Sequence, residues 1–147
     1  MTIRLANESD IPFVRDCATA AYEIYVERMG RKPAPMIADF AGTVSAGNLH
    51  VLETEDGLVG FVIFYPRGDH LHIENVAVNP AFQGKGHGTR LIEFVERQAK
   101  ELGFSRVELY TNEKMTENIA YYPALGYAEI GRWEEDGFNR VFYRKDL

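Results

Sequence analysis

The sequence contains one cysteine, Cys17, among its 147 residues. A single cysteine excludes an intramolecular disulfide and a zinc site built from cysteine ligands. Because Cys17 falls within an apolar helical pattern, we expect its thiol to be buried and inert.

Basic residues and long apolar runs are also scarce. The chain has 16 Lys and Arg against 22 Asp and Glu, a net charge of −6, and a pI near 5.2. No basic face is concentrated anywhere, which argues against a nucleic-acid partner. The first residues form no apolar signal region, and no stretch approaches a membrane-spanning length. We therefore expect a cytoplasmic protein that has no membrane partner.

The chain is also without repeats, linkers and low-complexity segments. Its length fits a single domain over residues 1–147, which would bury roughly two-thirds of the surface exposed by the unfolded chain.

Apolar periodicity and turn residues predict an order of β-α-α-β-β-β-α-β-α-β-β. In the second helix, Ile37, Phe40 and Val44 should point inward. The expected strands are 3–5, 49–53, 58–65, 71–78, 106–110, 127–133 and 140–143, and the expected helices are 10–29, 36–46, 89–102 and 117–125.

A glycine-rich turn, Gln83-Gly84-Lys85-Gly86-His87-Gly88, joins the strand that ends at Val78 to the following helix. Glycine permits positive φ and close approach of a ligand, while the free N–H groups of the helix start attract anions. The turn therefore predicts binding of a phosphate-bearing ligand. It lacks the spacing of a P-loop and of a dinucleotide fingerprint, so both of those readings fail.

The spacing Gln/Arg-x-x-Gly-x-Gly/Ala is present at Gln83, Gly86 and Gly88. Together with the order of elements, it resembles the GCN5-related N-acetyltransferase (GNAT) superfamily over essentially the whole chain. The resemblance implies an α/β (α+β) fold: a mixed, mainly antiparallel sheet with a central parallel pair splayed apart, flanked by about four helices. It also implies acetyl-CoA or coenzyme A as the acyl-donor substrate, and no metal.

The site residues implied by this resemblance match positions in three segments. Val76, Ala77 and Val78 correspond to the strand end that pairs with the pantetheine arm. The pyrophosphate loop corresponds to Gln83, Gly84, Lys85, Gly86, His87, Gly88 and Thr89, although the Lys85 and His87 side chains could also simply face solvent.

The third segment, Tyr122 to Tyr127, resembles the family's Tyr-x-x-x-Gly-Phe/Tyr ending and puts Tyr122 in the general-acid position. Many relatives carry Asn where this chain has Met115, so a polar contact to the cofactor must come from Asn112 or Asn118. Asn118 is preferred because it shares a helical face with Tyr122, whereas Asn112 fits a cap or turn.

A protonated amine needs a proton acceptor before it can attack a thioester, and the carbonyl oxygen needs an N–H donor, for which the backbone near Val78 is the candidate. Strand alternation places His70, His72, Glu74, Val76 and Val78 on one face if no bulge intervenes. Glu74 and His72 therefore compete for the role of base, and Glu74 is preferred because it is nearer the expected thioester.

These residues predict direct acetyl transfer to the primary amine of a small molecule or peptide. Tyr22, Tyr25 and Met29 are candidates for lining the acceptor pocket. A coenzyme A-binding or sensing module without catalysis is the alternative. The acceptor, the choice of acyl group, and the state as monomer or homodimer stay open.

Overall fold

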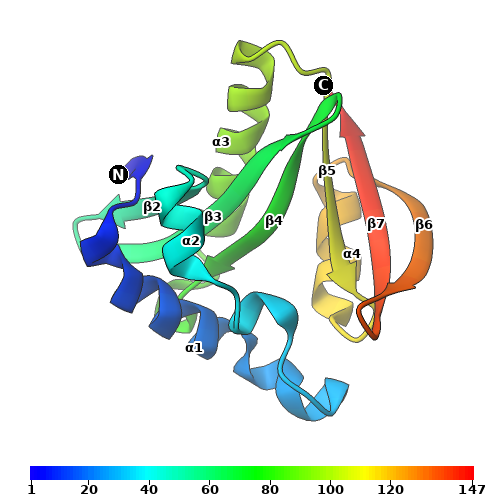
Figure 1. Ribbon diagram of the computed structural model, residues 1–147, viewed down its shortest axis with the longest axis horizontal. Helices are drawn as coiled ribbons and strands as arrows, with labels where there is room; N and C mark the ends of the chain where they lie inside the picture. The colour runs from blue at the N-terminus through cyan, green and yellow to red at the C-terminus, as the bar shows by residue number, and fades with distance from the viewer.

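The computed structural model describes all 147 residues as one seven-stranded sheet flanked by four α-helices (Figure 1). This order of strands and helices confirms the expected one. None of the helices is long and apolar enough to cross a membrane. The elements are β1 (Thr2–Leu5), α1 (Ile11–Met29), α2 (Phe40–Ser45), β2 (Leu49–Thr54), β3 (Gly57–Arg67), β4 (His70–Val78), α3 (His87–Glu101), β5 (Arg106–Asn112), α4 (Thr116–Ala124), β6 (Ala128–Glu135) and β7 (Phe138–Asp146).

The strands lie in the order β1-β2-β3-β4-β5-β7-β6, and only β4 and β5 are parallel. These two strands pair only from Leu71 opposite Val107 to Ile73 opposite Leu109. Beyond that point they separate toward their C-terminal ends, as Figure 1 shows. The expected splayed parallel pair is therefore confirmed, and the sheet consists of two halves joined over three residue pairs.

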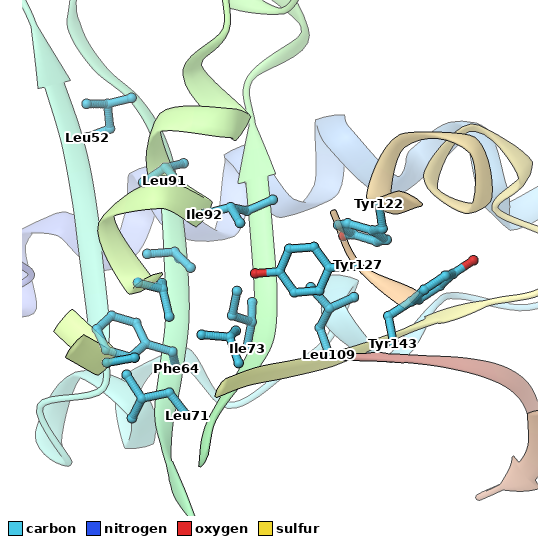
Figure 2. Packing of buried hydrophobic residues seen from close by; sticks show 14 of the residues in the cluster. Leu52, Phe64, Leu71, Ile73, Leu91, Ile92, Leu109, Tyr122, Tyr127 and Tyr143 are labelled. Atoms are coloured by element: carbon cyan, nitrogen blue, oxygen red, sulfur yellow. The ribbon is translucent and has the colours of Figure 1, made fainter. Parts of the chain in front are cut away.

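Two apolar clusters cover the two faces of the sheet. In one cluster, Leu91 of α3 and Tyr122 of α4 pack on the same face of the sheet as Ile73 of β4 (Figure 2). The other joins α1 and α2 to the opposite face and includes Cys17, which is fully buried. The expected burial of Cys17 is therefore confirmed, and burial raises the pKa of its thiol to about 12.

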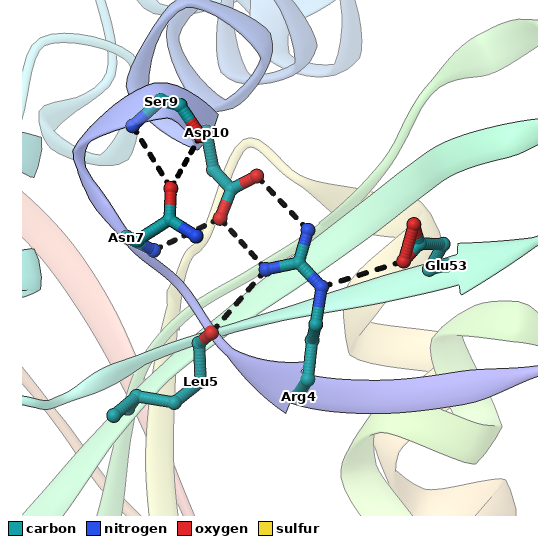
Figure 3. A network of polar contacts seen from close by, with 6 residues as sticks. All are labelled: Arg4, Leu5, Asn7, Ser9, Asp10 and Glu53. Carbon is teal, nitrogen blue, oxygen red and sulfur yellow. Dashed lines mark hydrogen bonds and ion pairs between the residues drawn. The ribbon is translucent and has the colours of Figure 1, made fainter.

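The start of α1 is held to the sheet by a polar network around Asp10 (Figure 3). Arg4 in β1 donates to both carboxylate oxygens of Asp10, at 2.9 and 3.1 Å, and to Glu53 in β2 at 3.4 Å. The Asn7 backbone N–H also donates to Asp10, at 2.9 Å. This network ties the residues just before α1 to β1 and β2.

The strand expected over 140–143 is longer in the structure, Phe138–Asp146, and two expected helices begin at least two residues away from their expected start. The helix expected over 36–46 is only α2, Phe40–Ser45, and Ile37 is 63% exposed rather than inward. Asp39 has a non-helical ψ of 84°, which interrupts the expected helix, and its side chain caps the shorter one by accepting from the Gly42 N–H. The helix α3 begins at His87, two residues earlier than expected.

A bulge in β4 overturns the expected common face of His70, His72, Glu74, Val76 and Val78. Phe64 in β3 pairs with Ile73, but the next residue, Ile63, pairs with Asn75, so Glu74 is an extra residue. An extra residue reverses the alternation of side chains beyond it. Ile73 and Val76 consequently pack on the α3 side, whereas His72 lies on the other face.

Candidate active site

A groove of about 570 Å³ runs along the open end of β4 toward the start of α3. It is bounded on one side by α1 and on the other by α4. The sequence-expected residues that line it are Val76, Ala77, Val78, Gln83, Gly84, Gly86, His87, Gly88, Thr89, Asn118 and Tyr122. The structure therefore brings the strand end, the glycine turn and α4 together around one elongated space.

The glycine turn presents its backbone to this groove. Gly84 and Gly86 have φ of 80° and 82°, which disfavours any residue with a Cβ. Gly86 caps α3, whose first intrahelical bond runs from the Arg90 N–H to the Gly86 carbonyl, so the preceding N–H groups are free for an anion. Arg90 also donates to the Lys85 carbonyl at 2.9 Å and adds a cation beside the turn.

The end of β4 offers backbone donors toward the gap left by β5. Asn79 donates to the Val59 carbonyl, so alternate residues Ala77 and Asn75 bond toward β3. The N–H groups of Val76 and Val78 therefore point away from β3. The Val76 carbonyl accepts from the Tyr22 hydroxyl at 2.9 Å, and the Val78 carbonyl accepts from Gln83 Nε2 at 3.1 Å.

A second cavity lies in the gap between β4 and β5, and it is called the acceptor cavity below because the expected acceptor-lining residues Tyr22 and Met29 line it. It meets the groove along β4, called the coenzyme groove below, at four residues that line both spaces: Tyr22, Val76, Asn118 and Tyr122. Past Glu74, Asn75 and Tyr110 it continues into a wider groove of about 600 Å³ along α2. A small molecule in the acceptor cavity would thus meet a ligand of the coenzyme groove beside Tyr122.

Tyr122 is 6% exposed and packs against Tyr143 at a ring distance of 5.7 Å (Figure 2). Its hydroxyl forms no hydrogen bond with the protein, and burial raises its pKa above the ordinary value of tyrosine. Asn118 donates to Thr111 Oγ1 at 3.1 Å, which leaves its carbonyl oxygen available at the junction.

Glu74, the extra residue of the bulge, lines the acceptor cavity and the groove along α2. It is half-buried, and desolvation raises the pKa of its carboxyl group above the usual range. Such a shift brings a carboxylate closer to the pH at which it can accept a proton efficiently.

His72 lies outside these spaces. It is 4% exposed and lies between the rings of Tyr65 and Tyr110, each with a centroid 5.5 Å away. Desolvation, with the nearby charges of Arg67, His70 and Arg140, lowers its pKa to about 4. The neutral ring therefore belongs to an aromatic row on the sheet, and its Nε2 has no partner.

The other expected site residues also differ in whether they line the coenzyme groove or the acceptor cavity. Lys85 does not line the coenzyme groove, and its ammonium lies 5.8 Å from the centroid of the Phe82 ring. Asn112 lines the acceptor cavity, and its Oδ1 accepts from the Lys114 N–H at 2.9 Å in the expected turn. Tyr22 and Met29 line the acceptor cavity, whereas Tyr25 lines the coenzyme groove.

Sequence reasoning missed three polar residues. Asn75 accepts from the Tyr22 hydroxyl at 2.8 Å and donates to the Pro35 carbonyl at 3.1 Å, which ties the bulge to α1 and the following loop. Arg90 lies inside α3, and Arg140 reaches the site from the hairpin of β6 and β7. Only Asn75, a polar residue inside an apolar strand, gave a signal that could have been used.

Comparison with known sequences finds a family match and several similar proteins. Residues 14–127 match the acetyltransferase (GNAT) family. The probable N-acetyltransferase 14 of Xenopus tropicalis is 32% identical over 96 residues, covering 63% of this chain and 47% of that protein. The [ribosomal protein bS18]-alanine N-acetyltransferase of Haemophilus ducreyi is 28% identical over 76 residues, covering 52% of each chain. These matches span about half the length of the curated relatives.

Solved structures agree over almost the whole chain. A GCN5-related N-acetyltransferase from Rhodopseudomonas palustris superposes with a TM-score of 0.80 at 21% identity, over 99% of this chain and 95% of that one. The PaiA N-acetyltransferase of Thermoplasma acidophilum, in complex with coenzyme A, gives 0.76 at 13% identity, over 99% and 98%. At these identities the likeness establishes the fold, and the family match covers most of the chain. The chain therefore belongs to the acetyltransferase (GNAT) family.

Proposed function

We propose that this protein is an acetyl-CoA-dependent N-acetyltransferase that transfers the acetyl group directly to a primary amine. The observation that carries the proposal is the junction of two spaces at Tyr122, one suited to a coenzyme and the other to an acceptor. The glycine turn binds the pyrophosphate through its free N–H groups, and the pantetheine arm lies along Val76 and Val78. The relatives named as N-acetyltransferases support this assignment.

The transfer begins with the acceptor amine. An alkylammonium has a pKa near 10.4, so freeing its lone pair at neutral pH costs about 4 to 5 kcal/mol. Glu74 accepts that proton, directly or through one water, because its carboxylate lies in the acceptor cavity and its pKa is raised by burial. His72 is a poorer base since it is buried outside this cavity.

The amine nitrogen then bonds to the thioester carbonyl carbon, and the carbonyl oxygen takes up negative charge. The N–H of Val78, which points away from β3, is the proposed donor to that oxygen. When the C–S bond breaks, the thiolate receives a proton from the Tyr122 hydroxyl, and the second proton of the attacking nitrogen passes to the Tyr122 oxygen as the amide forms. A thioester is already activated toward amines, so the proposed transfer uses no metal.

The remaining assignments concern cofactor contacts. We propose Asn118 as the polar contact from α4, because its free carbonyl oxygen lies where the two spaces meet, whereas the Asn112 amide oxygen is engaged in its turn. His87 and Thr89 line the groove at the start of α3 and are proposed phosphate contacts. Lys85 contributes through its backbone.

Release of free coenzyme A thiol from acetyl-CoA, measured across a panel of amines, tests the proposal. The enzyme should release thiol in the presence of an accepted amine and form the N-acetyl product in equal amount. Tight binding of coenzyme A without amine-dependent thiol release would instead favour a sensing module and overturn the proposed transfer.

A further inference from the structure

The acceptor cavity contains a second charged side chain, Arg140 of β7. The side chain is only 9% exposed. Its guanidinium group lies over the Tyr110 ring, 4.3 Å from the centroid, and 5.5 Å from the centroid of Phe138. Stacking on two rings holds the plane of the guanidinium in a fixed orientation inside the cavity.

Only one edge of this guanidinium is used by the protein. Nη1 donates to Glu135 at 3.0 Å and lies 3.9 Å from Asp136. Nε and Nη2 donate to no protein acceptor, and neither is among the polar atoms sealed away from solvent. A guanidinium fork with a free edge matches a carboxylate, which can accept two parallel hydrogen bonds from it.

Glu74 and Arg140 are the only charged side chains that line the acceptor cavity. Both act on Tyr110: burial raises the pKa of its hydroxyl, Arg140 opposes that rise, and Glu74 adds to it. An anion and a cation of the same cavity therefore both lie near Tyr110. Most other lining residues are apolar, and they include Met29, Pro33, Pro35, Met115 and Phe138.

We propose that the acceptor is an amino acid with an apolar side chain, whose amine meets Glu74 and whose carboxylate meets Arg140. This inference rests on the proposed acetyl transfer. The apolar walls and the adjoining groove along α2 leave space for the side chain, while the open edge of Arg140 supplies the carboxylate contact. Arg140 is then a specificity-determining residue.

Matched acceptors test the carboxylate requirement. Leucine, methionine and phenylalanine are compared with their amides and with the amines that lack the carboxyl carbon, by thiol release from acetyl-CoA. The amino acids should have kcat/KM higher by at least about 10-fold, because a site built to bind a group rejects analogues without it. The amides are the sharper control, since their amines are less basic than those of the acids.

Arg140→Met removes the cation and keeps an unbranched stem for packing. It should raise KM for amino acids by about 10-fold or more, so that the preference for amino acids over the simple amines shrinks by a similar factor. The matched control is Glu135→Gln, which breaks the same ion pair from a side chain that lines neither cavity. If Arg140 served only that ion pair, the two variants would behave alike.

Each outcome has a defined meaning. Equal use of acids, amides and amines by the wild-type enzyme overturns the acceptor inference, as does equal behaviour of the two variants, while the proposed acetyl transfer stands. If coenzyme A binds but no amine releases thiol, the proposed transfer fails. Calorimetry of leucine with the coenzyme A-loaded protein then tests whether the acceptor cavity binds an amino acid. Binding that Arg140→Met abolishes supports this inference, and absence of binding overturns it.

Discussion

Tyr122 and Tyr127 pack against one another, with ring centroids 6.3 Å apart, yet their hydroxyl groups have different surroundings. The Tyr127 hydroxyl donates to Glu96 at 2.9 Å and lines neither the coenzyme groove nor the acceptor cavity. The Tyr122 hydroxyl lies where those spaces meet and has no protein partner. Burial raises the pKa of Tyr122, so its hydroxyl is protonated at neutral pH, and its place at the junction is what would let it donate that proton to a thiolate.

Tyr122→Phe should therefore lower kcat by roughly 10²-fold or more and leave the KM for acetyl-CoA nearly unchanged. The ring remains, and no protein hydrogen bond is lost, so the fold should be retained. Tyr127→Phe removes a hydroxyl from the same cluster and should keep wild-type turnover. Wild-type turnover by Tyr122→Phe, under conditions where chemistry limits the rate, would reduce this residue to a packing role.

Glu74 links the proposed chemistry to stability. Its pKa is raised in the folded state, mainly by desolvation, so the folded protein binds this proton more tightly than the unfolded chain does. The resulting stabilisation is present below the ordinary carboxyl pKa and is lost as the pH rises through the raised value. At neutral pH the ionised carboxylate of Glu74 thus lowers the free energy of unfolding, and a neutral side chain at this position would not.

The free energy of unfolding of Glu74→Gln, relative to that of the wild type, should consequently increase as the pH rises from about 4 to about 7. The turnover of this variant should be lower than that of the wild type, because the proposed base is removed. Urea unfolding at both pH values measures the difference. Glu117→Gln is the opposite control, because Arg28 lowers the pKa of Glu117 to about 2 and the ionised form is the stabilising one. A Glu74→Gln variant whose relative stability did not change with pH would contradict a raised pKa of Glu74 in the folded protein.

At the scale of the element, the glycine turn combines a backbone requirement with an electrostatic one. Gly86 has positive φ and caps α3. Gly86→Ala adds backbone strain of about 1 kcal/mol, whereas Gly86→Asp adds the same strain and a negative charge beside bound phosphate. Calorimetry should find coenzyme A affinity weaker for Ala and much weaker for Asp. If the wild type, Gly86→Ala and Gly86→Asp bound coenzyme A equally well, the pyrophosphate would have to bind away from this turn.

The strand β4 shows what periodicity can and cannot predict. Its apolar residues and the glycines after it were sufficient to predict a strand, a turn and a helix. The bulge was not predictable, since an extra residue leaves no mark on local composition, and it is specified by pairing with β3. The exchange of faces between His72 and Val76 follows from that pairing.

The same limit applies to side chains brought together by the whole fold. Tyr122, Gln83 and Gly86 could be predicted as site residues because each belongs to a motif of residues close together in the sequence. Arg140 was not, because its place over Tyr110 depends on the pairing of β5 with β7, and Asn75 required the bulge. Contacts between distant segments need the three-dimensional arrangement.

Across the whole molecule, the two half-sheets share three residue pairs, and the end of α1 bridges the open side. Arg28 forms a bidentate ion pair with Glu117 of α4 at 2.8 and 2.9 Å, and Arg31 donates to the Asp136 carbonyl at 3.0 Å. The coenzyme groove is lined from both halves. A bound coenzyme would thus add contacts between the two half-sheets, which are joined by only three residue pairs of β4 and β5.

Coenzyme A should therefore slow amide hydrogen exchange in both halves, at Val76 and Val78 and also in α4. At 100 times its Kd it should stabilise the fold by about 2.7 kcal/mol, or roughly 5 to 10 °C in Tm. Exchange mass spectrometry with and without coenzyme A measures the distribution. Protection confined to the glycine turn would contradict a ligand that joins the halves.

Trp133, the sole tryptophan, lies flat on Phe142 at a centroid distance of 3.7 Å, and in the sheet it is the cross-strand partner of Arg140. Its indole is 47% exposed and lies in the hairpin that carries the proposed carboxylate contact. The protein therefore contains an intrinsic optical probe with no competing emitter of its kind. Movement of Arg140 toward an acceptor would be registered as a change in tryptophan emission, without a label and in real time.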